Sequence, residues 1–219
     1  MQATVTHPDE QVAAALRGDL TAYTALQCAG SAWSRWTPYG DRAVAYVREC
    51  CRVLQEAQIA PDATCRVCCA GCNDGLELEE FTRQGYDAEG FDLDPEKVRV
   101  AQACGCKAKV GDMHDPPYST GVYDGLFVSH VLEHARDHAV ACAALGALLR
   151  PGGVLFIVVP LEAAFPTQNP SHTGFVQAPD VILRHFNGWH FLEPRILDNP
   201  ERQAILVVRK PEVIHEATP

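Results

Sequence analysis

Three features are missing from this chain of 219 residues, and each absence excludes a class of protein. No apolar run is long enough to cross a bilayer, since the longest aliphatic or aromatic run is 154–159, so we expect no membrane contact. Lysine and arginine form no cluster and the formal net charge is −10, which argues against binding a nucleic acid through its phosphates. The polar, acidic start predicts no secretory signal, so we expect a cytoplasmic protein.

The residues at 64–92 predict the opening unit of a nucleotide-binding α/β sheet. A short apolar run, 67–70, leads into a turn with Gly71, Asn73 and Gly75, and helical periodicity follows over 76–84. A second strand ends at Asp92, which is 21 residues after Gly71. At that spacing a carboxylate reaches the ribose hydroxyls of a nucleotide held over the turn, so the ligand is predicted to be an adenosine derivative.

The glycine spacing disfavours NAD as that ligand. The dinucleotide fingerprint GxGxxG, begun at Gly71, needs glycine at positions 73 and 76, which hold Asn73 and Leu76. Close approach of the backbone to a pyrophosphate is therefore not supported. An NAD-type oxidoreductase stays open as an alternative.

The whole chain is predicted to form a Rossmann-like doubly wound α/β sheet of seven strands, mostly parallel with an antiparallel C-terminal hairpin and with helices on both faces. We expect residues 1–60 to be a helical leader that caps the pocket, 61–210 the sheet domain and 211–219 a tail. The leader holds helices at 9–17 and 41–58 and an aromatic loop at 31–40. Later strands are expected at 107–110, 123–129, 154–159, 189–197 and 203–209, and later helices at 94–103, 130–149 and 180–186.

Five segments at these intervals resemble the motifs of class I S-adenosylmethionine-dependent methyltransferases, in their small-molecule branch, over about residues 64–210. They are the turn at 69–75, GFDLDPEKVRVAQ, VGDMHD, YDGLFVSHVLEH and LRPGGVLFIVVP. The resemblance implies S-adenosylmethionine as cofactor. It places the ribose on Asp92, the adenine beside Asp112 and Met113, and further contacts at Cys69, Gly71, Asn73, Gly75, Leu93 and Ser129.

Cys69 departs from the family pattern, which has an acid at that position. A neutral thiol is a poor hydrogen-bond acceptor for the cationic cofactor. Asp74 is the carboxylate that could compensate. Cofactor affinity depends on this position.

The catalytic residues are sought directly after the fourth strand, where the predicted helix places His130, Glu133 and His134 on one face. This segment resembles the metal-binding Glu-x-x-Glu-His segment of small-RNA 2′-O-methyltransferases and ubiquinone-pathway O-methyltransferases, with His172 as the distal partner. The resemblance implies a divalent ion held by His130, Glu133, His134 and His172. Two alternatives stay open: a histidine among His130, His134 and His172 acts as a general base without metal, or these side chains only line the pocket.

Two other motifs have structural interpretations. Cys65, Cys68, Cys69 and Cys72 have zinc-finger-like gaps, but thiols that alternate along a strand point to opposite faces, so buried reduced cysteines are the better interpretation. Asp115 to Tyr118 spells the DPPY of DNA amino-methyltransferases. It precedes the predicted fourth strand, so we interpret it as a turn.

The sequence therefore predicts methyl transfer from S-adenosylmethionine to an oxygen or nitrogen of a small molecule. A non-catalytic binding module on the same fold is the alternative from another class. The acceptor, the choice among O-, N- and C-methylation, and the oligomeric state do not follow from these residues.

Overall fold

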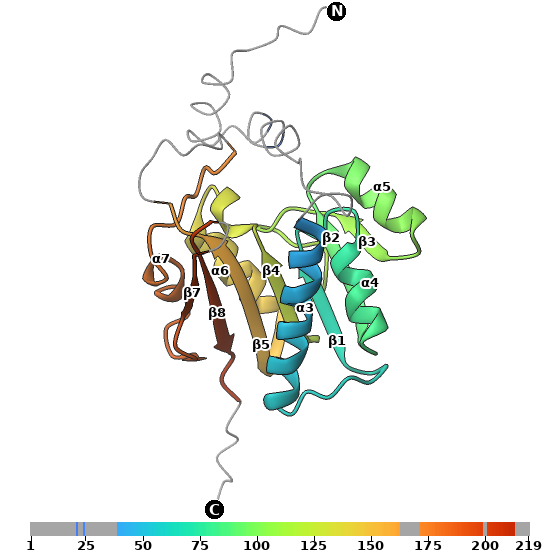
Figure 1. The fold of residues 1–219 in the computed structure, drawn as a ribbon, viewed down its shortest axis with the longest axis horizontal. Coiled ribbons are helices and arrows are strands. Elements are labelled where there is room, and N and C mark those ends of the chain that lie inside the picture. The colour runs from blue at the N-terminus through green and yellow to red at the C-terminus, as the bar shows by residue number, and fades with distance from the viewer. Residues whose placement is uncertain (1–20, 22–23, 25–38, 163–170, 199–200, 213–219) are drawn as a thin grey trace, which may run out of the picture.

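The strands of the computed structural model form one sheet in the spatial order β3-β2-β1-β4-β5-β8-β6, with β7 also paired to β8 (Figure 1). The structure describes residues 39–162, 171–198 and 201–212, together with Thr21 and Thr24. The strands are β1 (Arg66–Ala70), β2 (Asp87–Asp92), β3 (Lys107–Val110), β4 (Tyr123–Ser129), β5 (Leu149–Pro160), β6 (His190–Phe191), β7 (Arg195–Leu197) and β8 (Gln203–Arg209).

The first five strands are parallel, and β8 runs antiparallel to β5, β6 and β7. The chain moves outward from β1 to β3 and then returns to place β4 on the other side of β1. Ligands of doubly wound sheets bind at such a reversal, beyond the carboxyl ends of the strands. The predicted fold class is confirmed, and the reversal between β1 and β4 locates the expected site.

The strand count differs from the prediction by one. The segment expected as a single strand at 189–197 is divided into β6 and β7, which pair with opposite ends of β8. Pro194 lies between them, and a proline has no N–H to donate to a sheet. The predicted hairpin is therefore present, but its first strand is interrupted.

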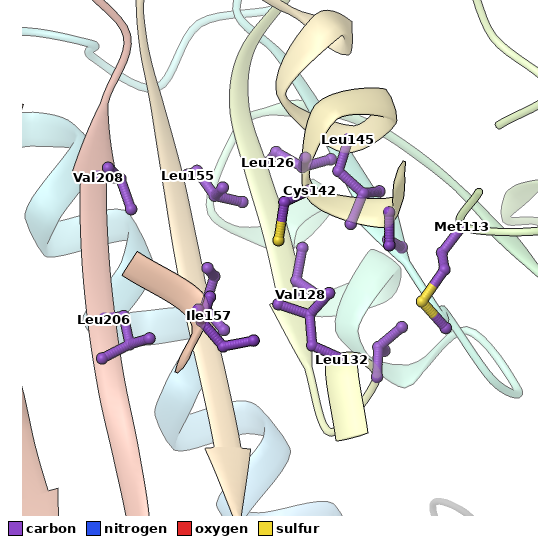
Figure 2. Packing of buried hydrophobic residues seen from close by; sticks show 14 of the residues in the cluster. Met113, Leu126, Val128, Leu132, Cys142, Leu145, Leu155, Ile157, Leu206 and Val208 are labelled. Carbon is purple, nitrogen blue, oxygen red and sulfur yellow. The ribbon is translucent and has the colours of Figure 1, made fainter. Parts of the chain in front are cut away.

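Helices cover both faces of the sheet, as predicted. They are α3 (Tyr39–Glu56), α4 (Leu76–Arg83), α5 (Pro95–Ala103), α6 (His138–Leu148) and α7 (Asp180–Leu183). Figure 1 shows α3 and α4 in front of the strands and α6 behind them. Side chains of α3, α4 and α5 join one buried cluster, and those of α6 and α7 join the other. Figure 2 shows the second cluster, with Cys142 and Leu145 of α6 beside Leu126 and Val128 of β4.

The cysteines of the first motif are divided between these two clusters. Cys68 packs in the cluster under α6, whereas Cys65, Cys69 and Cys72 pack in the cluster under α3 and α4. All four are buried free thiols. The prediction that they act as small hydrophobic side chains on opposite faces is confirmed.

The prediction of one long helix at 130–149 is wrong. His130 has a left-handed backbone with φ 53°, residues Leu132–His134 form one turn of 3-10 helix (η1), and α6 begins only at His138. The Asp137 side chain accepts hydrogen bonds from the N–H groups of Ala139 and Val140, which fixes that start. Glu133 and the neighbouring histidines therefore lie on a turn and not on one face of an α-helix.

The segment Arg150 to Gly153, which lies between the predicted helix at 130–149 and the predicted strand at 154–159, belongs to β5. The register against β4 shifts between Tyr123 and Gly125, so the extra residues form an irregularity inside the strand. Gly152 has φ 75°, which lets the backbone bend there. The predicted helix at 9–17, the aromatic loop before residue 39 and part of the loop after β5 lie outside the described residues.

Candidate active site

The turn between β1 and α4 has the left-handed backbone that its sequence predicts. Gly71, Asn73 and Gly75 have φ angles of 68°, 49° and 87°. A Cβ atom on Gly71 would lie 2.4 Å from Cγ2 of Val131, which follows β4. Glycine is thus required where β1 and β4 approach, and asparagine at position 73 is among the few other residues that tolerate this backbone.

Asp92 joins this turn to the end of β2. Its carboxylate accepts the N–H of Asn73 at 2.8 Å and the N–H of Asp94 at 2.9 Å. Burial raises the pKa of Asp92, and these two backbone hydrogen bonds partly oppose the rise. Leu93 follows directly, and Asp94 caps α5 through the N–H of Glu96. The carboxylate and the turn form one preorganised unit.

The position of the missing motif acid is deeply buried. Cys69 is 1% exposed, and burial raises the pKa of its thiol well above the usual value, so the group is neutral. Two buried carboxylates follow it in the turn and in α4: Asp74 is 5% exposed and Glu77 is 6% exposed. The Glu77 charge raises the pKa of Cys69, so the two side chains are within electrostatic reach. Sequence reasoning missed Glu77. Its position in the first turn of α4, on the buried face of the helix, is the feature that could have indicated it.

Asp112 lies at the centre of a polar network after β3. Its Oδ1 accepts hydrogen bonds from the backbone N–H and ring Nδ1 of His114, at 2.9 and 2.6 Å. Its Oδ2 accepts one from Arg136 at 2.6 Å. Burial alone would raise the pKa of Asp112, but these partners lower it well below the usual value. Met113 is buried at the edge of the core under α6 (Figure 2).

Tyr39 is a second residue that sequence reasoning did not single out. Its hydroxyl lies 3.2 Å from Oγ of Ser129, the last residue of β4. Its ring makes an edge contact with the His130 ring at 5.4 Å. His130 Nε2 lies 3.2 Å from Oε1 of Gln203 at the start of β8. Tyr39 and Ser129 therefore close the end of β4, and His130 is turned toward β8.

Three of the four predicted metal ligands are brought together. Potential ligand atoms of Glu133, His134 and His172 all lie within 4.8 Å of one another. The rings of His134 and His172 meet edge to face at 4.9 Å. His130 Nδ1 is 3.6 Å from Oε1 of Glu133, but this histidine is not part of the three-residue group. His172 thus lies beside Glu133 and His134, and His130 lies at the edge of the group.

Outer hydrogen bonds orient both histidines of the group. The Nδ1 atom of His134 lies 3.0 Å from the Ser171 carbonyl oxygen, so it carries the proton and donates it. The Nδ1 atom of His172 lies 2.8 Å from Oε1 of Glu162. Histidines that bind metals have such partners on the second ring nitrogen. Burial lowers the pKa of His134 to about 4, so this imidazole is neutral at pH 7.

Glu133 is a buried acid, and one of its carboxyl oxygens has no hydrogen-bond partner among the described residues. Its side chain is 1% exposed, and that oxygen is Oε2. Burial raises its pKa well above the usual value. A carboxylate oxygen left in this state is costly unless a cation or donor is supplied, so the donor set of two imidazoles and one carboxylate fits a divalent ion.

The DPPY segment has a structural role. It precedes β4, and the Tyr118 hydroxyl donates to the Gly90 carbonyl at 2.7 Å. The Tyr118 ring packs between Phe91 and Tyr123. Its interpretation as a turn is supported, since the tyrosine fastens β2 to the segment before β4.

This fold and turn define a nucleotide-binding α/β domain of the class I methyltransferase type. Residues 42–198 match the family model described as a methyltransferase domain. The match covers more than half of the chain, so the chain belongs to this family, whose cofactor is S-adenosylmethionine. The predicted resemblance and cofactor are confirmed at this level.

Curated relatives include ubiquinone biosynthesis O-methyltransferases. That of Xylella fastidiosa (strain 9a5c) is 29% identical over 134 residues, which cover 58% of this chain and 54% of the relative. That of Xanthomonas oryzae pv. oryzae (strain PXO99A) is 34% identical over 102 residues, 43% of each chain. The chain spans about half the length of the curated relatives it matches.

Solved structures share the fold. The Burkholderia thailandensis 1,6-didemethyltoxoflavin-N1-methyltransferase, with bound S-adenosylhomocysteine, has a TM-score of 0.60 and 19% identity, with 97% of this chain and 94% of that chain covered. The [4+2]-cyclase SpnF has a TM-score of 0.63 and 18% identity, with 84% and 85% covered. The fold thus occurs in proteins with different named activities.

Proposed function

We propose that the protein transfers a methyl group from S-adenosylmethionine to an oxygen or nitrogen atom of a small molecule. The observation that carries this proposal is the Asp92 carboxylate, hydrogen-bonded to the left-handed turn at Asn73 beside the reversal between β1 and β4. Family membership supports the reaction type, and the names of the curated relatives support oxygen as the acceptor atom.

In this proposal the cofactor lies across the ends of β1, β2 and β4. Asp92 receives the ribose hydroxyls, with Leu93 beside it, and the turn from Gly71 to Gly75 receives the amino-acid tail. Asp112 and Met113 face the adenine, and Ser129 lies near the transferred methyl group. The bound cofactor supplies a methyl group on a cationic sulfur, and the residues of the chain hold it in line with the acceptor.

Glu77 takes over the role of the missing motif acid in this arrangement. The thiol of Cys69 is neutral and cannot balance the cofactor's ammonium group. Glu77 is buried, lies in the first turn after Gly75 and is within electrostatic reach of Cys69. A carboxylate moved from the strand to the helix would restore the charge. Asp74, the residue expected to compensate, is also buried beside the turn.

Calorimetric titration with S-adenosylmethionine, S-adenosylhomocysteine and NAD tests the function. Binding of the first two supports the methyltransferase. Absence of binding favours a non-catalytic module, and preferential binding of NAD favours an oxidoreductase. Incubation with labelled S-adenosylmethionine and candidate phenols, alcohols and amines then separates oxygen from nitrogen acceptors.

A metal-assisted form of the reaction is the second candidate, and Glu133, His134 and His172 favour it. Two imidazoles and one carboxylate suit zinc, iron or manganese better than magnesium. A bound ion would lower the pKa of an acceptor hydroxyl. Ser171 and Glu162 orient the two histidines, and the unpartnered oxygen of Glu133 completes the donor set.

The other catalytic assignments fit less well with the contacts. His134 donates through Nδ1 to Ser171, and its Nε2 lies 3.9 Å from Oε1 of Glu133, an arrangement suited to a ligand more than to a general base. His130 is turned toward Gln203 and Tyr39, so we assign it to the pocket wall. A cytoplasmic location remains our proposal, based on the nine free cysteines of the described residues.

A further inference from the structure

A hollow lies beside the candidate site. Its volume is about 400 Å³, and we call it the basic pocket. Its lining includes Arg136, His138, Thr173, Gly174, Phe175 and Arg184. Ala135 and Arg136 follow His134, and Thr173 and Gly174 follow His172. The pocket is therefore built from the continuation of both segments that carry the candidate metal ligands.

The walls of the basic pocket are held by hydrogen bonds between these two segments. Thr173 Oγ1 donates to the His134 carbonyl and the Gly174 N–H donates to the Glu133 carbonyl, each at 2.8 Å. A Cβ atom on Gly174 would lie 2.2 Å from the Ala135 carbonyl oxygen, so the backbones are in direct contact. The pocket is preformed, which lowers the entropic cost of binding.

Two arginine side chains line this pocket, although the chain as a whole carries a formal charge of −10. They are Arg136 and Arg184. Arg136 is held by Asp112, whereas Arg184 is exposed and forms no ion pair with a carboxylate in the described part of the chain. His138 forms a further wall. Among the nearby acids, Asp137 is occupied by the backbone N–H groups at the start of α6.

Apolar side chains complete the pocket. Phe175 and Val181 face the same hollow as the two arginines. A volume of about 400 Å³ exceeds what a lone inorganic anion fills, and it is in the range of small-molecule sites. Such a lining matches an organic anion: an apolar body against Phe175 and Val181, and an anionic group against the guanidinium groups.

We propose that the basic pocket binds a carboxylate or phosphate group carried by the methyl acceptor and so selects acidic acceptors. This inference rests on the proposed function, because it takes the neighbouring residues to be the acceptor side of a methyltransferase. Arg184 provides the principal charge, and Arg136, fixed by Asp112, provides a second guanidinium of set position.

The test is a titration of the uniformly ¹⁵N-labelled full chain with benzoate, phenyl phosphate and neutral benzamide at constant ionic strength, without cofactor. The backbone signals of Gly174 and Phe175 report on the pocket. We expect saturable shifts with at least one anion and weaker binding of benzamide. A preference for benzoate indicates a carboxylate-bearing acceptor, and a preference for phenyl phosphate indicates a phosphorylated one.

Three variants sharpen the test. Arg184→Gln should weaken binding of the preferred anion by about fivefold, the range for a partly exposed ion pair, and Arg184→Lys should retain part of the affinity. Arg99→Gln, which removes an exposed arginine of α5, should leave the affinity unchanged. Benzamide binding as tightly as the anions, or equal affinity of wild type and Arg184→Gln, would overturn the proposal.

Failure of this inference and failure of the proposed function give different results. If S-adenosylmethionine binds and neither anion does, the basic pocket is wrongly assigned and the methyltransferase stands. If an anion binds through Arg184 and S-adenosylmethionine does not, the pocket is an anion site and the proposed reaction fails.

Discussion

The Thr173 side chain donates a hydrogen bond to the carbonyl oxygen of His134 at 2.8 Å, and this contact fastens the segment after β5 to the turn after β4. The neighbouring residue, His172, thereby comes to lie with its ring centre 4.9 Å from that of His134. Residues that are 38 positions apart in the chain thus share one site because a buried threonine ties their neighbours together.

Replacing Thr173 by valine should loosen this site. The variant keeps the shape of the side chain but leaves the His134 carbonyl without its donor, so the free energy of unfolding should fall by about 1 kcal/mol. Urea unfolding measures it. Thr82→Val is the matched control. The Thr82 hydroxyl also donates to a carbonyl, that of Leu78, but this contact lies within α4 and does not join two segments. Equal losses in both variants would contradict a special role for Thr173.

Replacing Asp92 by asparagine should weaken S-adenosylmethionine binding by about tenfold or more, because charge-assisted hydrogen bonds to the ribose are lost. The amide oxygen can still accept the N–H of Asn73 or Asp94, so the turn should persist. Calorimetry measures the dissociation constant. Asp87→Asn, at the opposite end of β2 and paired with Lys107, should bind like the wild type. Unaltered affinity in Asp92→Asn would remove the ribose contact from the account.

Glu77→Gln should lower the affinity for S-adenosylmethionine and S-adenosylhomocysteine by about tenfold. Binding of 5′-methylthioadenosine should not change, since that ligand lacks the ammonium group. Adding Cys69→Asp to this variant should recover affinity, because it returns a carboxylate to the position where the family has one. Glu79→Gln, in the same helical turn, is the control. A uniform loss for all three ligands would indicate a folding defect instead of a lost charge contact.

Elemental analysis of the purified chain tests the metal-assisted form. We expect zinc, iron or manganese near one equivalent in the wild type and loss of that metal in Glu133→Gln and His172→Gln. His190→Gln, which alters an exposed histidine on β6, should retain it. Full turnover by metal-free protein would exclude a catalytic ion and leave these residues as pocket structure.

Because of Asp112, the free energy of unfolding should fall as the pH is lowered into the acid range. Its pKa is lower in the folded chain than the unfolded value of about 3.9. The resulting stabilisation is therefore present above that unfolded value and is lost as the pH falls through the folded one. Asp112→Asn should cost about 1–2 kcal/mol at pH 7, and the difference from wild type should shrink below about pH 4. Thermal unfolding at pH 7, 5 and 3 measures it, with the exposed Asp198→Asn as control. A stability difference between wild type and Asp112→Asn that grows at acid pH would contradict this prediction.

The turn and the carboxylate of the proposed cofactor site could be predicted from the sequence because their signals are local. The left-handed turn at Gly71, Asn73 and Gly75 needs residues that tolerate positive φ, and the position of Asp92 follows from the length of one strand-helix-strand unit. The strand preceding Asp92 and the helix capped by Asp94 follow from periodicity and capping chemistry.

The arrangement of the residues in the proposed acceptor site could be predicted only in part. Periodicity over 130–149 indicated one helix, but the Asp137 cap and the left-handed His130 divide it. The approach of His172 to His134 depends on Thr173 and Gly174, which make tertiary contacts that no local pattern encodes. Tyr39 was not predicted because its partner Ser129 is distant in the chain, and Glu77 was not predicted because its burial depends on tertiary packing.

Two separate sets of connections carry the proposed cofactor site and the proposed acceptor site. Asn73, Asp92 and Glu77 all lie on one side of the boundary between β1 and β4. These groups come from the connections among the first three strands, whereas Arg184, His172 and their neighbours come from the connections beyond β4 and β5. Under the proposed function, we expect substitutions beyond β5 to change which acceptor is methylated and to leave binding of the methyl donor unaltered. A search for new acceptors should then vary residues 171–184 and keep residues 69–92 constant.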